Sequence, residues 1–281
     1  MRPIERVGVV IKPHAPGIET VLAELDEILK KHGIAVLFEK SAAELLGRPD
    51  GLSREEIPGR VDLVVVLGGD GTLLSIAHIA ARLGTPVLGV NMGKLGFLSE
   101  TPRGEMAEAL KELLPANEGL VSPRMMLEAS RDADRWLCLN DVVINKGALA
   151  RMLELTIRID GREIAAVRAD GLIVSTPTGS TAYTLAAGGP IIQPSIPAII
   201  LTPICPHTLT FRPMVISSKA RIQVGLQDSE EAFLTIDGQR GQPLSGGDMV
   251  DIARASCELK LIRSPRRTYF DVLKEKLSWG A

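Results

Sequence analysis

Residues 61–74 read VDLVVVLGGDGTLL and join a strand pattern to a helix pattern through a glycine turn. The run Leu63–Leu67 is apolar throughout, as in a buried strand, and a helical pattern opens at Thr72. Glycines leave the backbone N–H groups of a turn open to an anion, and a helix N-terminus adds partial positive charge. The turn predicts a phosphate-binding site made by Gly68, Gly69, Gly71 and Thr72. A turn that only packs a helix on a sheet remains the alternative.

Asp70 lies inside this turn and changes the prediction. A carboxylate repels phosphate, so within a phosphate site it has to hold a cation, orient a hydroxyl group or accept a proton. We therefore expect Asp70 to take part in the chemistry rather than in anion binding.

Strand and helix patterns alternate along the first 120 residues. Strand-like runs at 4–11, 34–38, 63–67 and 86–90 are followed by helical patterns at 18–29, 42–46, 72–83 and 105–114. The alternation predicts an α/β domain, residues 1–120, with a parallel Rossmann-like sheet that binds ligands at the carboxyl ends of its strands. Residues 47–60, which are rich in Gly, Pro and charge, predict a surface loop that serves as a linker or a lid.

After residue 120 the hydrophobic period becomes that of short strands. We expect strands at 124–130, 135–145, 152–159, 163–176, 208–217, 220–226, 232–236, 249–253 and 258–263, with hairpin turns at Asp160-Gly161 and Asp237-Gly238. Residues 121–264 are thus expected to form an all-β domain, either a sandwich or a partly open barrel. Within the tail, residues 265–281, we expect a helix over 266–277 that returns to the first domain, because a lone helix of this length is marginal in water.

Charge and composition narrow the class of partner. The net charge is −2, from 32 Lys and Arg against 34 Asp and Glu, so no basic field favours nucleic acid or an anionic membrane. No signal-peptide pattern or membrane-spanning apolar run is visible, which predicts a cytoplasmic protein with a small-molecule partner. Cys138, Cys205 and Cys257 lack CxxC spacing and the four histidines lack paired spacing, so we assign no metal ligand.

The β half contains one turn rich in small polar residues, TPTGST at 176–181. Its hydroxyl and N–H groups suit a ribose or a phosphate. Tyr183 adds an aromatic ring in a chain with only 3% aromatic residues, which favours contact with a base over ordinary packing. Asn140-Asp141 supplies an amide and a carboxylate for a base or a ribose, although this dipeptide is also common in turns.

Six stretches, taken in order, resemble the motifs of the NAD kinase family. They are GGDGTLL at 68–74, NMGKLGFL at 91–98, LNDVVI at 139–144, ADGLIVSTPTGSTAYTLAAGGPIIQP at 169–194, FRPMVI at 211–216 and IDGQ at 236–239. GGDGT alone is shared with diacylglycerol and sphingosine kinases, whereas STPTGSTAY and the Asn-Asp pair are more specific. The resemblance implies ATP- and Mg²⁺-dependent phosphorylation of the 2′-hydroxyl of the adenosine ribose of NAD, which gives NADP.

The resemblance also implies roles for single residues. The aspartate that matches Asp70 accepts the proton of the hydroxyl group. NAD is implied to contact Asp70, Gly71, Asn140, Asp141, Arg151, Arg168, Asp170, Thr181, Ala182, Tyr183, Thr184, Leu185, Ala186 and Gln239. Mg²⁺ is implied to be held mainly through substrate phosphates, and the chain to form a homodimer or homotetramer.

Some choices within the family stay open. Ser75 stands where many members carry a basic side chain, and Arg168 resembles the residue of members that prefer NAD to NADH. The sequence does not decide whether the glycine turn holds phosphates of the donor or of the dinucleotide, or whether other nucleotides or polyphosphate replace ATP.

Two other classes of protein share part of the pattern. A lipid kinase uses the GGDGT turn but has no need for STPTGSTAY. A non-catalytic NAD(P)-binding sensor would keep the dinucleotide contacts but has no reason to keep Asp70 in the turn. A P-loop NTPase is excluded, because Gly93-Lys94 is followed by Leu95 and the GxxxxGK[ST] spacing is absent.

Overall fold

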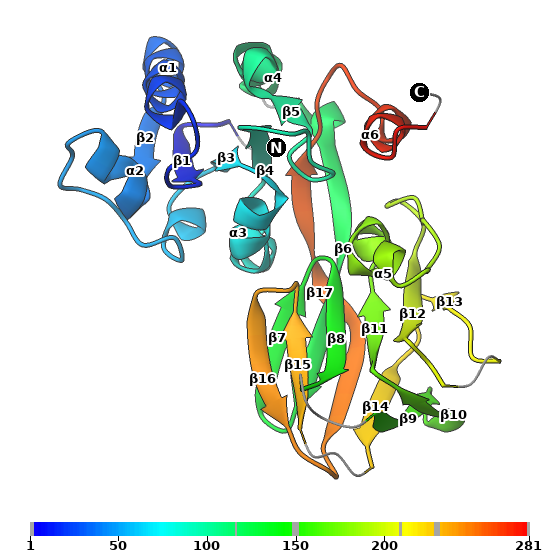
Figure 1. Ribbon diagram of the computed structural model, residues 1–281. Coiled ribbons are helices and arrows are strands. Elements are labelled where there is room, and N and C mark those ends of the chain that lie inside the picture. The colour runs from blue at the N-terminus through cyan, green and yellow to red at the C-terminus, as the bar shows by residue number, and fades with distance from the viewer. Residues whose placement is uncertain (1–2, 116, 148–151, 208–209, 228–230, 280–281) are drawn as a thin grey trace. The chain divides into compact units, whose positions relative to one another are not determined.

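The computed structural model describes residues 3–115, 117–147, 152–207, 210–227 and 231–279 (Figure 1). The chain divides into two compact units. Unit 1 comprises Met1–Pro123 and Leu259–Ala281, and unit 2 comprises Arg124–Glu258.

Unit 1 is built on a parallel sheet. Its strands lie in the order β4-β3-β1-β2, and each adjacent pair is parallel. They are β1 (Arg6–Ile11), β2 (Ala35–Phe38), β3 (Leu63–Gly68) and β4 (Val87–Asn91), and both β5 (Thr101–Pro102) and the end of β17 (Met249–Ile262) also pair with β4. The helices are α1 (Ile18–Lys31), α2 (Lys40–Leu45), α3 (Asp70–Leu83), α4 (Met106–Leu113) and α6 (Tyr269–Lys276). The predicted α/β fold with a parallel sheet is confirmed.

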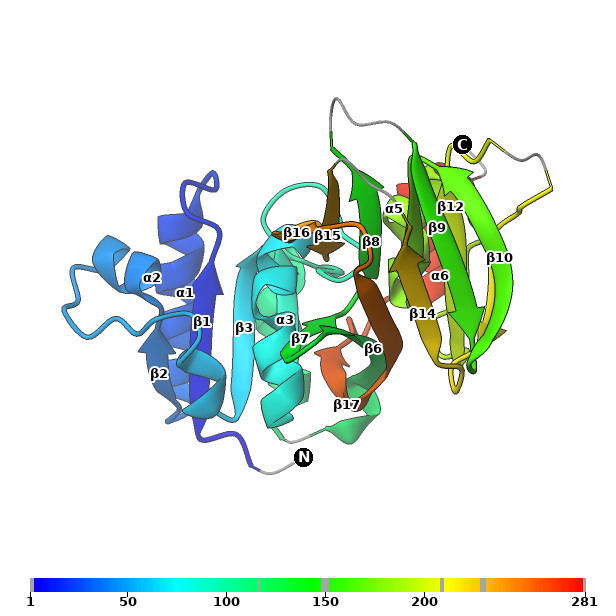
Figure 2. The same cartoon turned by 90° about the horizontal axis from the view of Figure 1, so that it is seen from below.

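Helices cover both faces of this sheet (Figure 2). On one face, Val9 and Val65 belong to the same apolar cluster as Leu22 of α1 and Leu110 of α4. Successive side chains of a strand point to opposite faces, so Val64 points to the other face, which α3 covers, and it too is fully buried. A strand that is buried on both faces needs apolar residues at every position, which explains the unbroken run in β3.

Most of residues 47–60 are exposed or half-buried, as predicted for a surface loop, but two points hold the segment in place. Ile57, in a 3-10 turn at Ile57–Gly59, is fully buried. Arg54 donates from Nε to Oε2 of the buried Glu39 at 2.8 Å and from Nη2 to the carbonyl oxygen of Ile11 at 3.1 Å. The Arg54–Glu39 ion pair anchors this connection between α2 and β3 at the carboxyl end of β1.

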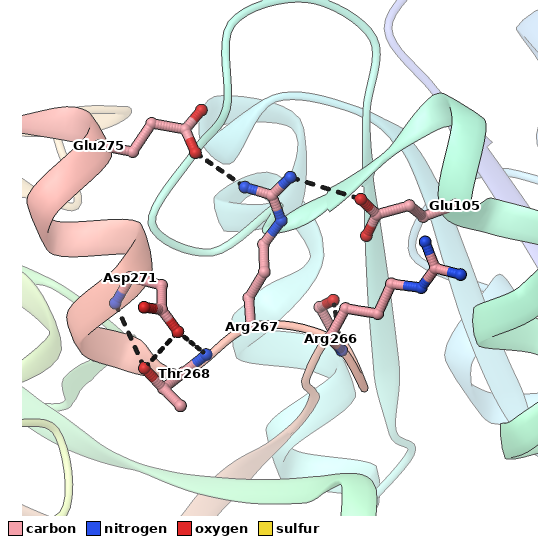
Figure 3. A network of polar contacts seen from close by, with 7 residues as sticks. Glu105, Arg266, Arg267, Thr268, Asp271 and Glu275 are labelled. Atoms are coloured by element: carbon pink, nitrogen blue, oxygen red, sulfur yellow. Dashed lines mark hydrogen bonds and ion pairs between the residues drawn. The ribbon is translucent and has the colours of Figure 1, made fainter.

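The tail packs on unit 1, as the marginal stability of an isolated helix predicted. α6 begins with a capping box, in which Thr268 and Asp271 bond each other's backbone N–H groups (Figure 3). Arg267 bridges Glu275 at 2.8 Å and Glu105, in the 3-10 turn before α4, at 3.3 Å (Figure 3). Val272 and Leu273 are buried, so an apolar contact accompanies these ion pairs.

Unit 2 consists of two antiparallel layers of strands around one core. The first layer has the order β13-β12-β11-β8-β15-β16, and the second contains β10-β9-β14-β17 with β6 and β7. Val142, Val174 and Leu234 of the first layer share an apolar cluster with Ile157 and Val224 of the second. The bounds are β6 (Val121–Arg131), β7 (Asp134–Cys138), β8 (Asp141–Lys146), β9 (Leu153–Ile159), β10 (Arg162–Ala169), β11 (Gly171–Ser175), β12 (Ala198–Ile204), β13 (Met214–Ser217), β14 (Ile222–Leu226), β15 (Ala232–Ile236) and β16 (Arg240–Leu244), with a short helix α5 (Tyr183–Ala186). The predicted β-rich C-terminal domain is confirmed in its sandwich form.

Several predicted strand limits in unit 2 were wrong. The runs 135–145 and 163–176 each contain two strands, and 249–253 and 258–263 belong to the single strand β17. β12 and β16 were missed, because Pro203 and Pro243 interrupt their patterns. β16 accommodates its proline at the edge of a sheet. Both hairpin turns are present, with positive φ at Asp160 and Asp237 (50° and 51°).

Candidate active site

The GGDG turn lies at the carboxyl end of β3. α3 begins at Asp70, and no side chain caps its N-terminus. A Cβ at Gly69 or Gly71 would meet no atom within 4 Å, whereas Gly68 packs against Thr72 and Lys12. The N-terminus of α3 therefore places partial positive charge beside Gly69 and Gly71, where no side chain fills the space.

The loop after β4 binds the carboxylate of Asp70. Oδ2 accepts a hydrogen bond from the N–H of Phe97 at 2.8 Å. Oδ1 accepts from the N–H groups of Leu98 at 3.1 Å and Ser99 at 2.9 Å, and from the Ser99 hydroxyl at 2.8 Å. A Cβ at Gly96 would lie 2.0 Å from Oδ1, so the loop approaches Asp70 this closely only with glycine at that position.

The two carboxylate oxygens of Asp70 differ in the number of hydrogen bonds that they accept. Oδ1 accepts three hydrogen bonds from the loop, whereas Oδ2 accepts one. A carboxylate oxygen has about two lone pairs, so Oδ2 has the greater capacity for a substrate hydroxyl. Asp70 thus has a structural role that the sequence did not indicate, in addition to any chemical one.

A basic group contacts Ser75, the α3 position where the resemblance led us to expect a basic side chain. Nη1 of Arg54 donates to Ser75 Oγ at 2.9 Å. Glu39 accepts from two other nitrogens of the same guanidinium, at 2.8 and 3.0 Å. The positive charge at this point of the helix therefore comes from another segment and is largely neutralised by Glu39.

Unit 2 contains a pocket of about 330 Å³ that brings several predicted residues together. Tyr183 is 45% exposed and lies on the pocket wall, so its ring is not part of the core. The lining residues are Asn140, Asp141, Val143, Asn145, Ala182, Tyr183, Thr235, Asp237 and Gly238. A larger hollow in unit 2, of about 750 Å³, contains none of the predicted residues.

Both halves of the chain match known protein families. Residues 7–118 match the ATP-NAD kinase N-terminal domain, and residues 139–264 match the ATP-NAD kinase C-terminal domain. The chain belongs to the NAD kinase family. NAD kinases of Geotalea daltonii and Syntrophotalea carbinolica are each 45% identical to it, over 99% of both chains.

Solved structures of this family have the same fold. Yeast NADH kinase complexed with NADH superposes with a TM-score of 0.89 at 28% identity, over 100% of this chain and 89% of that one. An NAD kinase from Archaeoglobus fulgidus in complex with ATP gives 0.81 at 26% identity, over 98% and 100%.

The polar turn shared with the NAD kinase family uses most of its hydroxyl groups internally. The Thr176 hydroxyl donates to the carbonyl oxygen of Leu139, that of Ser180 to Pro177, and that of Thr181 to the carbonyl oxygen of Thr178. A Cβ at Gly179 would lie 2.1 Å from the carbonyl oxygen of Asn140. The expectation that these hydroxyls bind ribose or phosphate is wrong for Thr176 and Ser180, because both are buried. Thr176 bonds the segment before Asn140, and Ser180 bonds Pro177 and Ile192.

The remaining residues implied by the NAD kinase resemblance lie outside the pocket lining. The exposed Arg168 pairs with Glu154 at 3.1 Å, and Asp170 pairs with Lys146 at 2.9 Å. Thr181, Leu185 and Ala186 flank Ala182 and Tyr183 in the chain, the buried Thr184 faces Ser175, and Gln239 completes the β15–β16 turn. Arg151 lies outside the described residues.

Two buried carboxyl groups give the pocket its electrostatic character. Burial, followed by the charge of Asp237, raises the pKa of Asp141 from 3.8 to about 7. Burial also raises the pKa of Asp237, against the opposing effect of three backbone N–H donors and Arg240. Near neutral pH the pocket therefore changes its charge through Asp141.

Sequence reasoning missed the pocket residues Val143, Asn145, Thr235, Asp237 and Gly238. Val143 and Asn145 follow Asp141 at the even spacing that places side chains on one face of a strand, and this signal was available. Asp237 was assigned only to a hairpin turn, although it belongs to the IDGQ stretch. Among the described residues, no three His, Cys, Asp or Glu side chains are grouped to hold a metal ion, and no helix is long and apolar enough to cross a membrane.

Proposed function

We propose that this chain transfers the γ-phosphoryl group of ATP to the 2′-hydroxyl of the adenosine ribose of NAD and so forms NADP. The observation that carries the proposal is the pocket that joins Asn140 and Asp141 to Tyr183, in a chain of the NAD kinase family. An aromatic ring beside an amide and a carboxylate suits a nucleoside, because the ring can stack on a base while the polar groups bond ribose hydroxyls.

Positioning should contribute more to this reaction than proton abstraction. Phosphoryl transfer passes through a loose transition state in which the bond to the attacking oxygen is barely formed, so that little positive charge develops on the hydroxyl group and removal of its proton gains little. Alignment of the reactants supplies about 7–11 kcal/mol, against about 3–5 kcal/mol for a general base. Asp70 Oδ2 is then the group that orients the 2′-hydroxyl and accepts its proton, while Oδ1 stays bonded to the loop.

We propose that Mg²⁺ arrives with the phosphates of ATP. Mg²⁺ commonly keeps several waters and binds through one or two carboxylates together with substrate phosphates. The ion would neutralise phosphate charge, and the partial positive charge at the N-terminus of α3 would attract the phosphate oxygens.

Assembly into a homodimer or homotetramer is a further part of the proposal. The resemblance to the NAD kinase family supports it. Light scattering of the purified protein during gel filtration tests it, and a monomer at micromolar concentration would contradict it.

The activity is tested by incubating the purified protein with NAD, ATP and Mg²⁺ and measuring NADP with an NADP-specific dehydrogenase. Parallel reactions replace NAD with NADH, ATP with polyphosphate, or NAD with diacylglycerol vesicles. We expect NADP from NAD and ATP, and a lower rate with NADH. Phosphorylation of the lipid alone would favour a lipid kinase, and binding of NAD without turnover would favour a sensor.

A further inference from the structure

Three consecutive backbone N–H groups converge on the carboxylate of Asp237. Oδ1 accepts from Asn140 at 2.7 Å, from Leu139 at 3.1 Å and from Asp141 at 3.2 Å, and Oδ2 accepts from Leu139 at 2.9 Å. Convergent backbone N–H groups of this kind bind anions. Here the anion is a side chain from the turn between β15 and β16.

The carbonyl groups of the same three residues are also bonded. Leu139 accepts from the Thr176 hydroxyl at 2.5 Å, and Asn140 accepts from the Thr176 N–H at 2.9 Å. Asp141 accepts from the N–H of Asp237 at 3.0 Å. Asp237 and Thr176 therefore bond all six backbone polar groups of Leu139–Asp141.

We propose that Asp237, together with Thr176, is a positioning residue of the dinucleotide site. It fixes the backbone of Leu139–Asp141, so that the side chains of Asn140 and Asp141 meet the ligand in one orientation. A segment held at every polar group loses little freedom on binding, and such pre-organisation strengthens affinity. The inference rests on the proposed function, since it concerns the site for NAD.

The geometry of the turn alone does not explain why residue 237 is an aspartate. The turn requires a residue that tolerates the left-handed backbone of Asp237, and asparagine does so as well. Burying an anion is unfavourable unless hydrogen bonds compensate, and Asp237 is only 8% exposed. The N–H groups of the site segment supply that compensation, so the carboxylate and the segment depend on each other.

The chain offers a matched control for Asp237→Asn. Asp160 occupies the same kind of Asp-Gly hairpin turn, with a positive φ, and its carboxylate bonds the N–H of Arg221 at 2.9 Å. Asp160 does not line the pocket. We expect Asp237→Asn to raise the KM for NAD, and its Kd by equilibrium dialysis with labelled NAD, at least tenfold, with a smaller change in kcat. Asp160→Asn should leave both within twofold.

The pH dependence of NAD affinity distinguishes a loss of positioning from a loss of the folded state. The titratable and charged groups around Asp141 and Asp237 are the Cys138 thiol and Arg240. Because Asp237→Asn removes the negative charge next to Asp141, the midpoint of the pH dependence of NAD affinity should move to lower pH. An unchanged midpoint, or a Kd within twofold of the wild-type value, would overturn the proposal.

A second pair of variants covers the case in which Asp237→Asn does not fold. Thr176→Val removes the hydroxyl bond to Leu139 at nearly constant volume, whereas Thr176→Ser keeps it. We expect the valine variant to bind NAD at least fivefold more weakly than the serine variant, and equal affinities would overturn the proposal. A wild-type protein that makes no NADP would instead contradict the proposed function, so the two failures are distinguishable.

Discussion

Asp70 has a structural role in the loop after β4, and the proposed function adds a chemical role for the same side chain. Its Oδ1 holds the loop at residues 98–99, and its Oδ2 bonds Phe97 with capacity left for a hydroxyl group. A substitution that only removes the charge therefore still disturbs the loop, because an amide nitrogen would face the N–H of Phe97. The two roles have to be separated by a second variant that affects the loop alone.

Asp70→Asn should lower kcat by about two orders of magnitude or more, the low end of the range for loss of a general base, while the KM for NAD changes little. Ser99→Ala is the control, since it removes one donor to Oδ1 and leaves the carboxylate intact. We expect kcat of Ser99→Ala to remain within about fivefold of wild type, because the net value of one hydrogen bond is about 1 kcal/mol. Steady-state kinetics measure both, and near-normal turnover of Asp70→Asn would exclude the proton-acceptor role.

Tyr183→Ala should weaken NAD binding more than it slows the bound-state reaction. The ring lies half exposed on the pocket wall, and stacking on a base contributes about 1–3 kcal/mol. Tyr183→Phe keeps the ring and should bind NAD almost normally. An unchanged KM for NAD in the alanine variant would show that the ring does not contact the ligand.

The pKa of Asp141, raised by burial to about 7, predicts two pH dependences. Its folded-state pKa lies above its unfolded value of about 4, so its contribution to stability is present below pH 4 and is lost as the pH rises through 7. The Tm of the ligand-free protein should therefore fall over this range more steeply than that of Asp141→Asn. NAD affinity should change in the opposite sense, because the ionised carboxylate accepts from ribose hydroxyls. A Tm difference between the two proteins that does not vary with pH would contradict the assignment.

The sequence predicted the elements that are determined by residues close together in the chain. The β3–turn–α3 unit follows from an apolar run and glycines, and both hairpin turns follow from Asp-Gly pairs. The sequence could not reveal that Asp237 bonds Asn140 across a separation of 97 residues. Nor could it reveal that the Thr176 and Ser180 hydroxyls point inward, since their partners lie in other segments or depend on the turn conformation.

A substitution at Gly179 tests how closely the polar turn must approach the backbone of Asn140. A Cβ there would lie 2.1 Å from the backbone oxygen of Asn140, which cannot move away cheaply. Gly179→Ala should cost about 1–3 kcal/mol of stability, or about 2–4 °C in Tm per kcal/mol, and weaken NAD binding. Gly241→Ala, where a Cβ meets nothing within 4 Å, is the control and should change neither quantity. Equal Tm and affinity for the two variants would show that the approach is not required.

At the scale of the whole molecule, each unit supplies a different part of the chemistry. Unit 1 has the N-terminus of α3 and Asp70, which suit phosphates and a hydroxyl, and unit 2 has the pocket of about 330 Å³. The alternating patterns predicted this division because a parallel α/β sheet and an antiparallel sandwich have different hydrophobic periods. Membership of the NAD kinase family then connects the two parts to one reaction.

The regiochemistry of the product tests the account most directly. The purified wild-type protein is incubated with NAD, ATP and Mg²⁺, and the product is examined by phosphorus NMR and with an NADP-specific dehydrogenase. We predict one new phosphomonoester on the 2′-oxygen of the adenosine ribose, formed in equal amount to the ADP released. ATP consumption without a 2′-phosphate on NAD, or a phosphate at another hydroxyl, would contradict the account.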